Sequence, residues 1–117
     1  MNVYHYKTEG GKDVILDYIN SIDNKREKAR ILALIKELEK HGLEFLNCLE
    51  TRQLVGKLWE IKYSKHRIMY VVIDGNNMYL IHACKKQKQK TEKYELEKAK
   101  ARVRELEKLT GKKLLWV

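Results

Sequence analysis

LWEIKYSKHRIMYVVIDGNNMYLIHAC, residues 58–84, is the stretch of sequence that decides the fold. It opens with a period of two, in which Trp59, Ile61 and Tyr63 alternate with Leu58, Glu60 and Lys62. Successive side chains of a strand point to opposite faces, so this alternation predicts a β-strand with two different faces. The strand begins at about residue 57.

Two further strands follow in the same stretch. Residues 67–73 (RIMYVVI) form a β-branched run long enough for a central strand, and residues 78–84 (MYLIHAC) are the returning strand. Between them, DGNN at residues 74–77 is a hairpin signal, because Gly and Asn accept the positive φ angles of a tight turn. The stretch therefore predicts an antiparallel meander of three strands.

The residues before the meander predict a strand and two helices. Residues 3–8 (VYHYKT) are rich in β-forming side chains. Apolar residues at helical spacing predict a short helix over about residues 12–22, and Asp23 or Asn24 then caps a longer helix that ends near Gly42. Residues 43–56 predict a helical turn followed by a short strand.

A last helix is predicted after the meander. Thr91 is the expected N-cap, and Glu92 and Glu95 place negative charge in the first turn, where it is favoured. The apolar stripe consists of Leu96, Ala99, Val103 and Leu106. Residues 110–117 form a short tail that includes Trp116 and docks on this chain or on a partner.

These elements predict an α+β fold. Its parts are an N-terminal strand and two helices, packed on an antiparallel sheet of three to four strands, and a C-terminal helix. The chain contains no proline and no linker rich in Ser and Gly, so residues 1–117 are interpreted as one domain.

Positive charge is concentrated in the C-terminal third of the chain. The formal net charge is +9, and residues 85–117 carry twelve basic and five acidic groups, a balance of +7. Such a field indicates an acidic partner, which can be a nucleic acid, an anionic membrane surface or an acidic protein.

Other classes of protein are disfavoured. No apolar stretch approaches the roughly 18 residues that span a bilayer, and the N-terminus lacks the apolar core of a signal peptide, so a cytoplasmic protein without a membrane partner is expected. Cys48 and Cys84 have no metal-ligand spacing, which favours two buried, inert thiols and no metal site. No Walker-type glycine loop and no GxSxG sequence occur.

The remaining chemistry that the sequence supports is cleavage of RNA. Attack by the 2′-hydroxyl on its phosphodiester needs a base, cations over the phosphorane and an acid for the leaving 5′-oxygen. Lys, Arg, His and Tyr can supply all of these without a metal. The candidates on the meander are Lys57, Lys62, Lys65, Arg67 and His82. Those that follow it are Lys85, Lys86, Lys88 and Lys90.

Each candidate also has a structural interpretation. Arg67 can be a strand-end charge in solvent or the partner of Glu60 in a salt bridge. His82 lies inside an apolar strand, where a histidine is more often a half-buried residue with satisfied hydrogen bonds than a catalyst. The run of lysines from Lys85 to Lys90 can be a solvated loop.

The order of several short sequences resembles a known family. These are LWEIK (58–62), HRIMYVV (66–72), the DG turn and LIHA (80–83), followed by Lys86, Gln89, Lys90, Thr91 and the helix start ELxxA. Together they resemble the phage-derived HigB-like branch of the RelE/ParE toxin superfamily, over roughly residues 3 to 106.

The resemblance implies a toxin of a type II toxin-antitoxin system. Most such toxins are ribosome-dependent endoribonucleases that cut mRNA, and in this branch the cognate antitoxin usually carries a helix-turn-helix domain. Arg67 matches an arginine implicated in phosphate contact, His82 matches the histidine of the family, and Lys86 and Lys90 match its lysines.

The chain departs from the family pattern at four positions. Cys84 replaces an aromatic residue, and Gln87, Lys88 and Glu92 replace a lysine, a threonine or similar residue and a proline. Pro and Glu are both acceptable at the first helical position, so the helix start is unaffected. The exchanges at 87 and 88 leave open which lysine meets the phosphate.

The sequence thus leads to a hypothesis of a cofactor-free endoribonuclease that acts on mRNA on the ribosome. In it, Arg67 and Lys57 or Lys62 hold the scissile phosphate. Proton transfer and charge stabilisation are shared by His82, Tyr94, Lys86, Lys88 and Lys90, with Lys65 and Lys85 in contact with RNA. The alternatives are a ParE-like inhibitor of DNA gyrase and a basic module that binds RNA or an antitoxin without cleavage.

Overall fold

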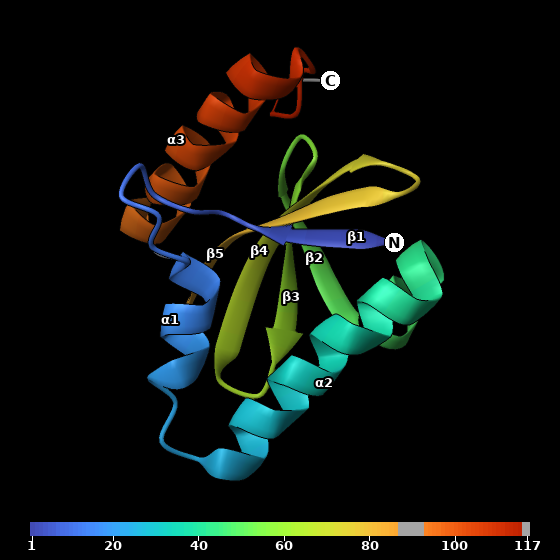
Figure 1. Cartoon of the computed structure of the whole chain (residues 1–117), viewed down its shortest axis with the longest axis vertical. Helices are drawn as coiled ribbons and strands as arrows, with labels where there is room; N and C mark the ends of the chain where they lie inside the picture. Colours follow the sequence, from blue (N-terminus) through green and yellow to red (C-terminus); the bar gives the residue numbers. More distant parts are fainter. Residues whose placement is uncertain (87–92, 116–117) are drawn as a thin grey trace.

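The computed structural model describes residues 1–86 and 93–115, and Figure 1 shows a central sheet with helices on both of its faces. Four helical elements are present in this part of the chain: α1 (Val14–Asn20), α2 (Lys25–His41), the 3₁₀-helix η1 (Gly42–Cys48) and α3 (Lys93–Thr110). The strands are β1 (Asn2–His5), β2 (Glu50–Val55), β3 (Leu58–Tyr63), β4 (His66–Asp74) and β5 (Asn77–Lys85).

The meander predicted from residues 58–84 is confirmed. Strands β3, β4 and β5 are antiparallel neighbours, with Lys62 opposite Arg67 and Arg67 opposite Cys84. The hairpin between β4 and β5 forms at Gly75 and Asn76, but neither residue adopts a positive φ. Instead, the Asp74 carboxylate accepts a hydrogen bond from the Asn76 amide, which stabilises the turn through a side chain.

The sheet is larger than expected from the sequence and is mixed. Its five strands have the order β1-β5-β4-β3-β2, and β1 pairs with β5 in parallel. The prediction of an antiparallel sheet of three to four strands was therefore wrong in the number of strands and in the direction of the edge strand β1. The N-terminal strand ends at His5, earlier than the predicted residue 8, although Lys7 still forms a single bridge with Asp13.

The helices begin and end near the predicted residues. The Asp13 carboxylate accepts hydrogen bonds from the amides of Ile15 and Leu16, and the Asn24 side chain caps α2. Helix α2 ends at His41, and Gly42 is its C-cap with a φ of 71°. The helical turn and short strand expected over residues 43–56 are η1 and β2. Thr91 and Glu92, the predicted start of the last helix, lie outside the described residues.

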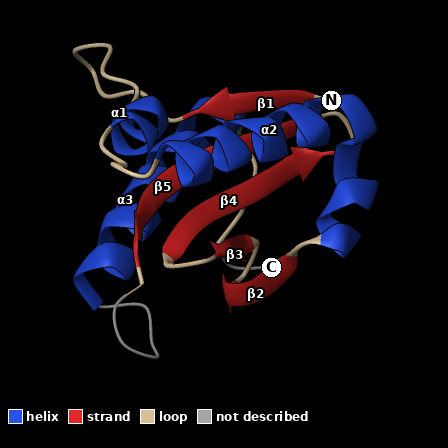
Figure 2. Ribbon diagram, turned by 90° about the horizontal axis from the view of Figure 1, so that it is seen from below, coloured by secondary structure: helices blue, strands red, loops and turns tan. Residues whose placement is uncertain are grey.

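Each face of the sheet is covered by a separate apolar cluster. Helices α1 and α2 pack on one face through residues such as Ile15 and Leu38, and α3 packs on the other through the predicted stripe of Ala99, Val103 and Leu106 (Figure 2). Because both faces are buried, β4 is apolar on both sides rather than alternating with polar residues. None of the described helices is long and apolar enough to cross a bilayer.

The C-terminal tail packs on the chain's own core. Leu114 and Leu115 are buried in the same cluster as α3, and the Lys57 amide donates a hydrogen bond to the Leu114 carbonyl at 2.6 Å. The Glu107 carboxylate accepts hydrogen bonds from the amides of both leucines. These contacts place the tail on this chain, one of the two possibilities left open by the sequence, while Trp116 lies outside the described residues.

Candidate functional site

A β-bulge in β5 brings the candidate residues onto one face of the sheet. Met69 pairs with His82 but Tyr70 pairs with Leu80, so one extra residue of β5 stands opposite this point of β4. In such a bulge two consecutive side chains point the same way. Ile81 packs in the cluster under α3 and His82 bonds to residues of α3, whereas Leu80 lies in the cluster under α1 and α2. His82 therefore shares the α3 face with Arg67.

Arg67 is held at the start of β4 by its backbone and by a buried carboxylate. Its Nη1 atom donates hydrogen bonds to the carbonyl oxygens of Ser64 at 3.0 Å and His66 at 2.8 Å. Its Nε atom lies 3.9 Å from Oε1 of Glu60. The salt bridge considered from the sequence is thus present, and the guanidinium is fixed in direction.

Glu60 also orients a second arginine. This carboxylate is 1% exposed, and its Oε1 atom lies 3.2 Å from Nη2 of Arg52, directly opposite it on β2. A buried carboxylate without cations would be costly, so the two guanidiniums stabilise it and it in turn fixes both of them. Lys62, opposite Arg67 in the sheet, adds a third cation to the same face.

His82 has a hydrogen-bond partner on each ring nitrogen. Nη1 of Arg102 lies 2.8 Å from Nδ1, and Oε2 of Glu95 lies 2.5 Å from Nε2. A guanidinium can only donate, so Nδ1 accepts and the proton of a neutral ring resides on Nε2, where it is donated to Glu95. Burial lowers the pKa of His82, and Arg102 and Lys98 lower it further, against the opposing effect of Glu95. The histidine with satisfied hydrogen bonds that was considered from the sequence is observed, although its side chain is buried rather than half-buried.

Cys84 lies beside this pair without a metal-like arrangement. Burial and the neighbouring Glu95 raise the pKa of the Cys84 thiol to about 12. The donor atoms of His82, Cys84 and Glu95 lie within 4.8 Å of one another. A metal on Nε2 would leave a proton on Nδ1, facing the donor group of Arg102, whereas histidine ligands normally donate that proton to an acceptor. The three residues as arranged do not fit a metal ion. Cys48 is exposed and Cys84 is intermediate in exposure, so the prediction of two buried thiols was wrong.

The other predicted cations are distributed over two ends of the sheet. Lys65, Lys85 and Lys86 lie at the same end of the sheet as Arg67, because the Lys86 amide bonds the Lys65 carbonyl at 2.6 Å and Lys85 pairs with His66. Lys65 and Lys85 nevertheless line a hollow with His66 on the face covered by α1 and α2, opposite Arg67. Lys57 precedes β3 at the opposite end of that strand from Lys62, beside a hollow that Trp59 also lines. The structure does not place Lys57 beside Arg67.

Two of the predicted lysines, Lys88 and Lys90, lie outside the described residues. Tyr94, in the first turn of α3 and next to Glu95, is 69% exposed, and the Lys98 ammonium lies 5.6 Å from the centre of its ring. Tyr94 can therefore contact a partner at the edge of the site.

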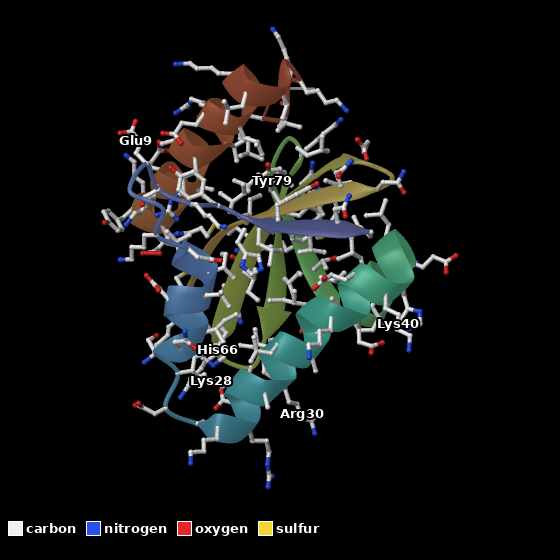
Figure 3. The ribbon with its side chains drawn as sticks, in the orientation of Figure 1. Glu9, Lys28, Arg30, Lys40, His66 and Tyr79 are labelled. Atoms are coloured by element: carbon white, nitrogen blue, oxygen red, sulfur yellow. The ribbon has the colours of Figure 1, made fainter. Side chains whose placement is uncertain are left out.

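A second polar cluster lies on the opposite face, between α1 and α2 (Figure 3). His66 is 1% exposed, its Nε2 atom lies 2.8 Å from Oε1 of Glu27, and its Nδ1 atom lies 2.7 Å from the Tyr18 hydroxyl. The sequence had placed His66 in a turn, but it is the first residue of β4. This cluster joins β4 to both N-terminal helices and is separated from Arg67 by the sheet.

Comparison with known families agrees with this arrangement of elements. The family model described as Phage derived protein Gp49-like matches residues 17–104, which include α2, the whole meander and most of α3. The chain belongs to the Gp49-like family. This is a toxin-like family related to RelE and HigB proteins. No curated protein matches the chain.

Three residues of this Gp49-like site were not found by sequence reasoning. They are Arg52, Glu95 and Arg102. Arg52 lies on β2, where the sequence predicted only a short strand without a register. Glu95 carried a signal as a negative charge in the first helical turn, but its contact with His82 depends on how α3 packs on the sheet. Arg102 lies outside the apolar stripe of the helix, and nothing in the sequence marks it as a partner of His82.

Proposed function

We propose that this Gp49-like chain is the toxin of a toxin-antitoxin pair and acts as a ribosome-dependent endoribonuclease on mRNA. The observation that carries the proposal is the convergence of Arg52, Lys62 and Arg67 on one face of the sheet, at the end where Lys65 and Lys86 also lie. Cations held in fixed directions suit the charge that develops on a phosphorane. The family supports a toxin and, with it, an antitoxin partner.

The proposed reaction needs no cofactor. The 2′-oxygen of a ribose attacks the adjacent phosphorus, its proton passes to a base, and the bond to the 5′-oxygen breaks as an acid supplies a proton. The Arg67 and Arg52 guanidiniums pair with the non-bridging oxygens, since each offers parallel donors and keeps its charge at all relevant pH values. Lys62, on the same face, adds electrostatic stabilisation.

His82 has a role other than proton transfer, for which lysines are the candidates. Both of its ring nitrogens are occupied, so we propose His82 as a positioning residue that fixes Glu95 at the N-terminal turn of α3. Tyr94 then stands at the edge of the site, where it can stack on a base. The lysines at 86, 88 and 90 remain candidates for proton transfer and charge stabilisation, and single substitutions among them are expected to cost only part of the rate.

The experiment combines growth, transcript and ribosome assays. Expression of the chain alone is expected to arrest growth, and the purified protein should create new 5′ ends in mRNA on translating ribosomes. Arg67→Ala should lower the cleavage rate by about 10²-fold, the usual cost of one transition-state donor. Arg67→Lys should recover part of the rate, because it keeps the charge but loses the fork.

The matched control is Arg30→Ala, since Arg30 is exposed on α2 and points away from the sheet in Figure 3. It should cleave like the parent chain, and thermal unfolding should show that all variants are folded. An Arg67→Ala protein as active as the parent removes Arg67 from the site. Intact mRNA together with relaxed plasmids and DNA-damage signalling would instead indicate a gyrase inhibitor, and intact mRNA with RNA binding would indicate a binding module.

A further inference from the structure

A groove lies between β1 and the C-terminal half of α3, away from Arg67. It has a volume of about 530 Å³, and the residues of the β1-α3 groove that matter here are Tyr4, Tyr6, Tyr79, Arg102, Leu106 and Leu109. The rings of Tyr4 and Tyr79 stack with their centres 4.9 Å apart, and Tyr79 lies on the α3 side of the sheet in Figure 3. Leu109 is 84% exposed at the rim. The groove therefore offers aromatic and aliphatic surface to a partner.

Charged side chains of both signs line the groove. Its two carboxylates are already used within the fold, since Asp13 bonds His5 and the first amides of α1, and Glu105 accepts the Tyr6 hydroxyl at 2.7 Å. Two cations, Lys7 and Arg102, also line it, and Lys7 is exposed. A carboxylate that enters the groove thus meets two cations, and the two carboxylates that line it are already held by hydrogen bonds within the fold.

Arg102 presents donors that suit a carboxylate. Its guanidinium carbon lies 4.8 Å from the centre of the Tyr6 ring, so the group stacks on the ring and keeps its in-plane donors accessible. Both of its hydrogen bonds to described residues, to the Ile81 carbonyl and to His82, leave from Nη1. The Nε and Nη2 donors remain, and these two form the edge on which arginine binds a carboxylate in a bidentate pair.

We propose that the β1-α3 groove is the docking site for a segment of the antitoxin in which an apolar side chain stands beside a carboxylate. The inference rests on the proposed toxin function. The apolar side chain would pack on Tyr4 and Leu109 while the carboxylate pairs with Arg102. An acidic protein fits this chain, whose formal charge is +9, and the exposed aliphatic rim suits a protein better than a polynucleotide.

The position of Arg102 links the groove to the site. The same guanidinium that faces the groove donates to Nδ1 of His82, and His82 holds Glu95. A partner that draws Arg102 toward itself weakens the hydrogen bond to His82, so docking changes the support of Glu95 and Tyr94 without covering Arg67. The groove is thereby a place from which the antitoxin regulates the toxin.

The experiment measures binding to the protein encoded beside this chain's gene, with both proteins purified and the affinity determined by calorimetry. Leu109→Gln, at an exposed helical position, should weaken binding about tenfold, as expected when a leucine that the partner covers is replaced by a polar residue. Arg102→Gln should weaken it by a similar factor through loss of the carboxylate pair. The matched controls are Leu32→Gln on α2 and Arg104→Gln on the exposed side of α3, which should bind like the parent.

The link to the site has its own readout. Addition of the same partner should shift the ring ¹⁵N resonance assigned to Nδ1 of His82 in the parent chain, and an unchanged resonance in the complex would overturn the link. Unchanged affinity of the Leu109→Gln and Arg102→Gln variants, or no binding of that partner by the parent chain, would overturn the docking site. These results are independent of mRNA cleavage by the chain alone, so failure of the proposed function would be recognised separately.

Discussion

Glu60 is the single residue on which the arrangement of cations depends most. Its buried carboxylate lies on β3, between Arg52 of β2 and Arg67 of β4. Removing one partner from a buried ion pair leaves an uncompensated charge, which is far more destabilising than loss of a surface pair. The site is therefore built so that neither arginine can easily turn away from the face where RNA is proposed to bind.

The pH dependence of stability should report the environment of His82. Because burial and two cations lower its pKa in the folded chain below the ordinary value of 6.5, the folded state binds this proton less well than the unfolded state. The stabilisation from neutral His82 is thus fully present above that pH and is lost as the pH falls. We expect the free energy of unfolding of the parent to decrease on acidification from about pH 7.5 to about pH 5.5.

The His82→Gln variant isolates this contribution. It should be less stable than the parent by about 1 to 3 kcal/mol at neutral pH, because Glu95 and Arg102 lose a partner, and its stability should fall less on acidification. The rest of the chain is the same in both proteins, so its contribution cancels in the difference. Chemical denaturation at each pH provides the measurement, and parallel pH profiles for the two proteins would contradict a lowered pKa at His82.

Some contacts of the site could be predicted from the sequence, and others could not. The pairing of Arg67 with Glu60 could be considered because both lie on strands of clear period, joined by a short turn. The lowered pKa of His82 could not be derived from the sequence, since its partners Glu95 and Arg102 come from a helix whose position on the sheet is set by tertiary packing. Local patterns carry no information on such contacts.

Among the elements, β5 shows most clearly where a periodic sequence pattern fails to predict the face on which a side chain lies. Strict alternation along residues 78–84 would put Leu80 and His82 on the same face, but the bulge separates them. The period of α3, by contrast, predicted the buried stripe correctly, because a helix without irregularities keeps its faces. The parallel addition of β1 was not predictable from its own residues, as an edge strand can pair in either direction.

The packing of the C-terminal tail on the turn between β2 and β3 provides a test at the level of elements. Gly56 has a φ of 55°, and a Cβ atom there would lie 1.7 Å from the Leu115 carbonyl oxygen. Gly56→Ala should therefore lower the free energy of unfolding by about 2 kcal/mol or more, through backbone strain and displacement of the tail.

The matched control for Gly56→Ala is Gly75→Ala in the hairpin of β4 and β5. Gly75 has no positive φ, and a Cβ atom added there would have no other atom within 4 Å beyond its chain neighbours. This substitution should leave stability within about 0.5 kcal/mol of the parent. Thermal and denaturant unfolding measure the stabilities of the two variants. Equal stabilities would mean that the tail does not pack against Gly56.

For the molecule as a whole, the excess of positive charge should appear in the salt dependence of RNA binding. Each phosphate that a cation neutralises releases counterions, so the logarithm of the affinity falls with the logarithm of the salt concentration by roughly 0.7 per contact for single strands. Lys62 stands on the proposed RNA face opposite Arg67, with its ammonium 3.7 Å from the exposed Glu50 carboxylate. Removal of the Lys62 charge should reduce both the affinity for RNA and the slope of its logarithm against the logarithm of the salt concentration.

We therefore expect Lys62→Gln to bind a single-stranded RNA oligonucleotide more weakly than the parent at about 50 mM salt, with a slope smaller by roughly 0.7. Lys40→Gln, at the exposed C-terminal end of α2, removes the same charge from the molecule without touching the RNA face. If only the net charge mattered, the two variants would lose affinity equally. Fluorescence anisotropy across a salt series separates the cases, and a slope for Lys62→Gln identical to that of the parent would place Lys62 outside the contact with RNA.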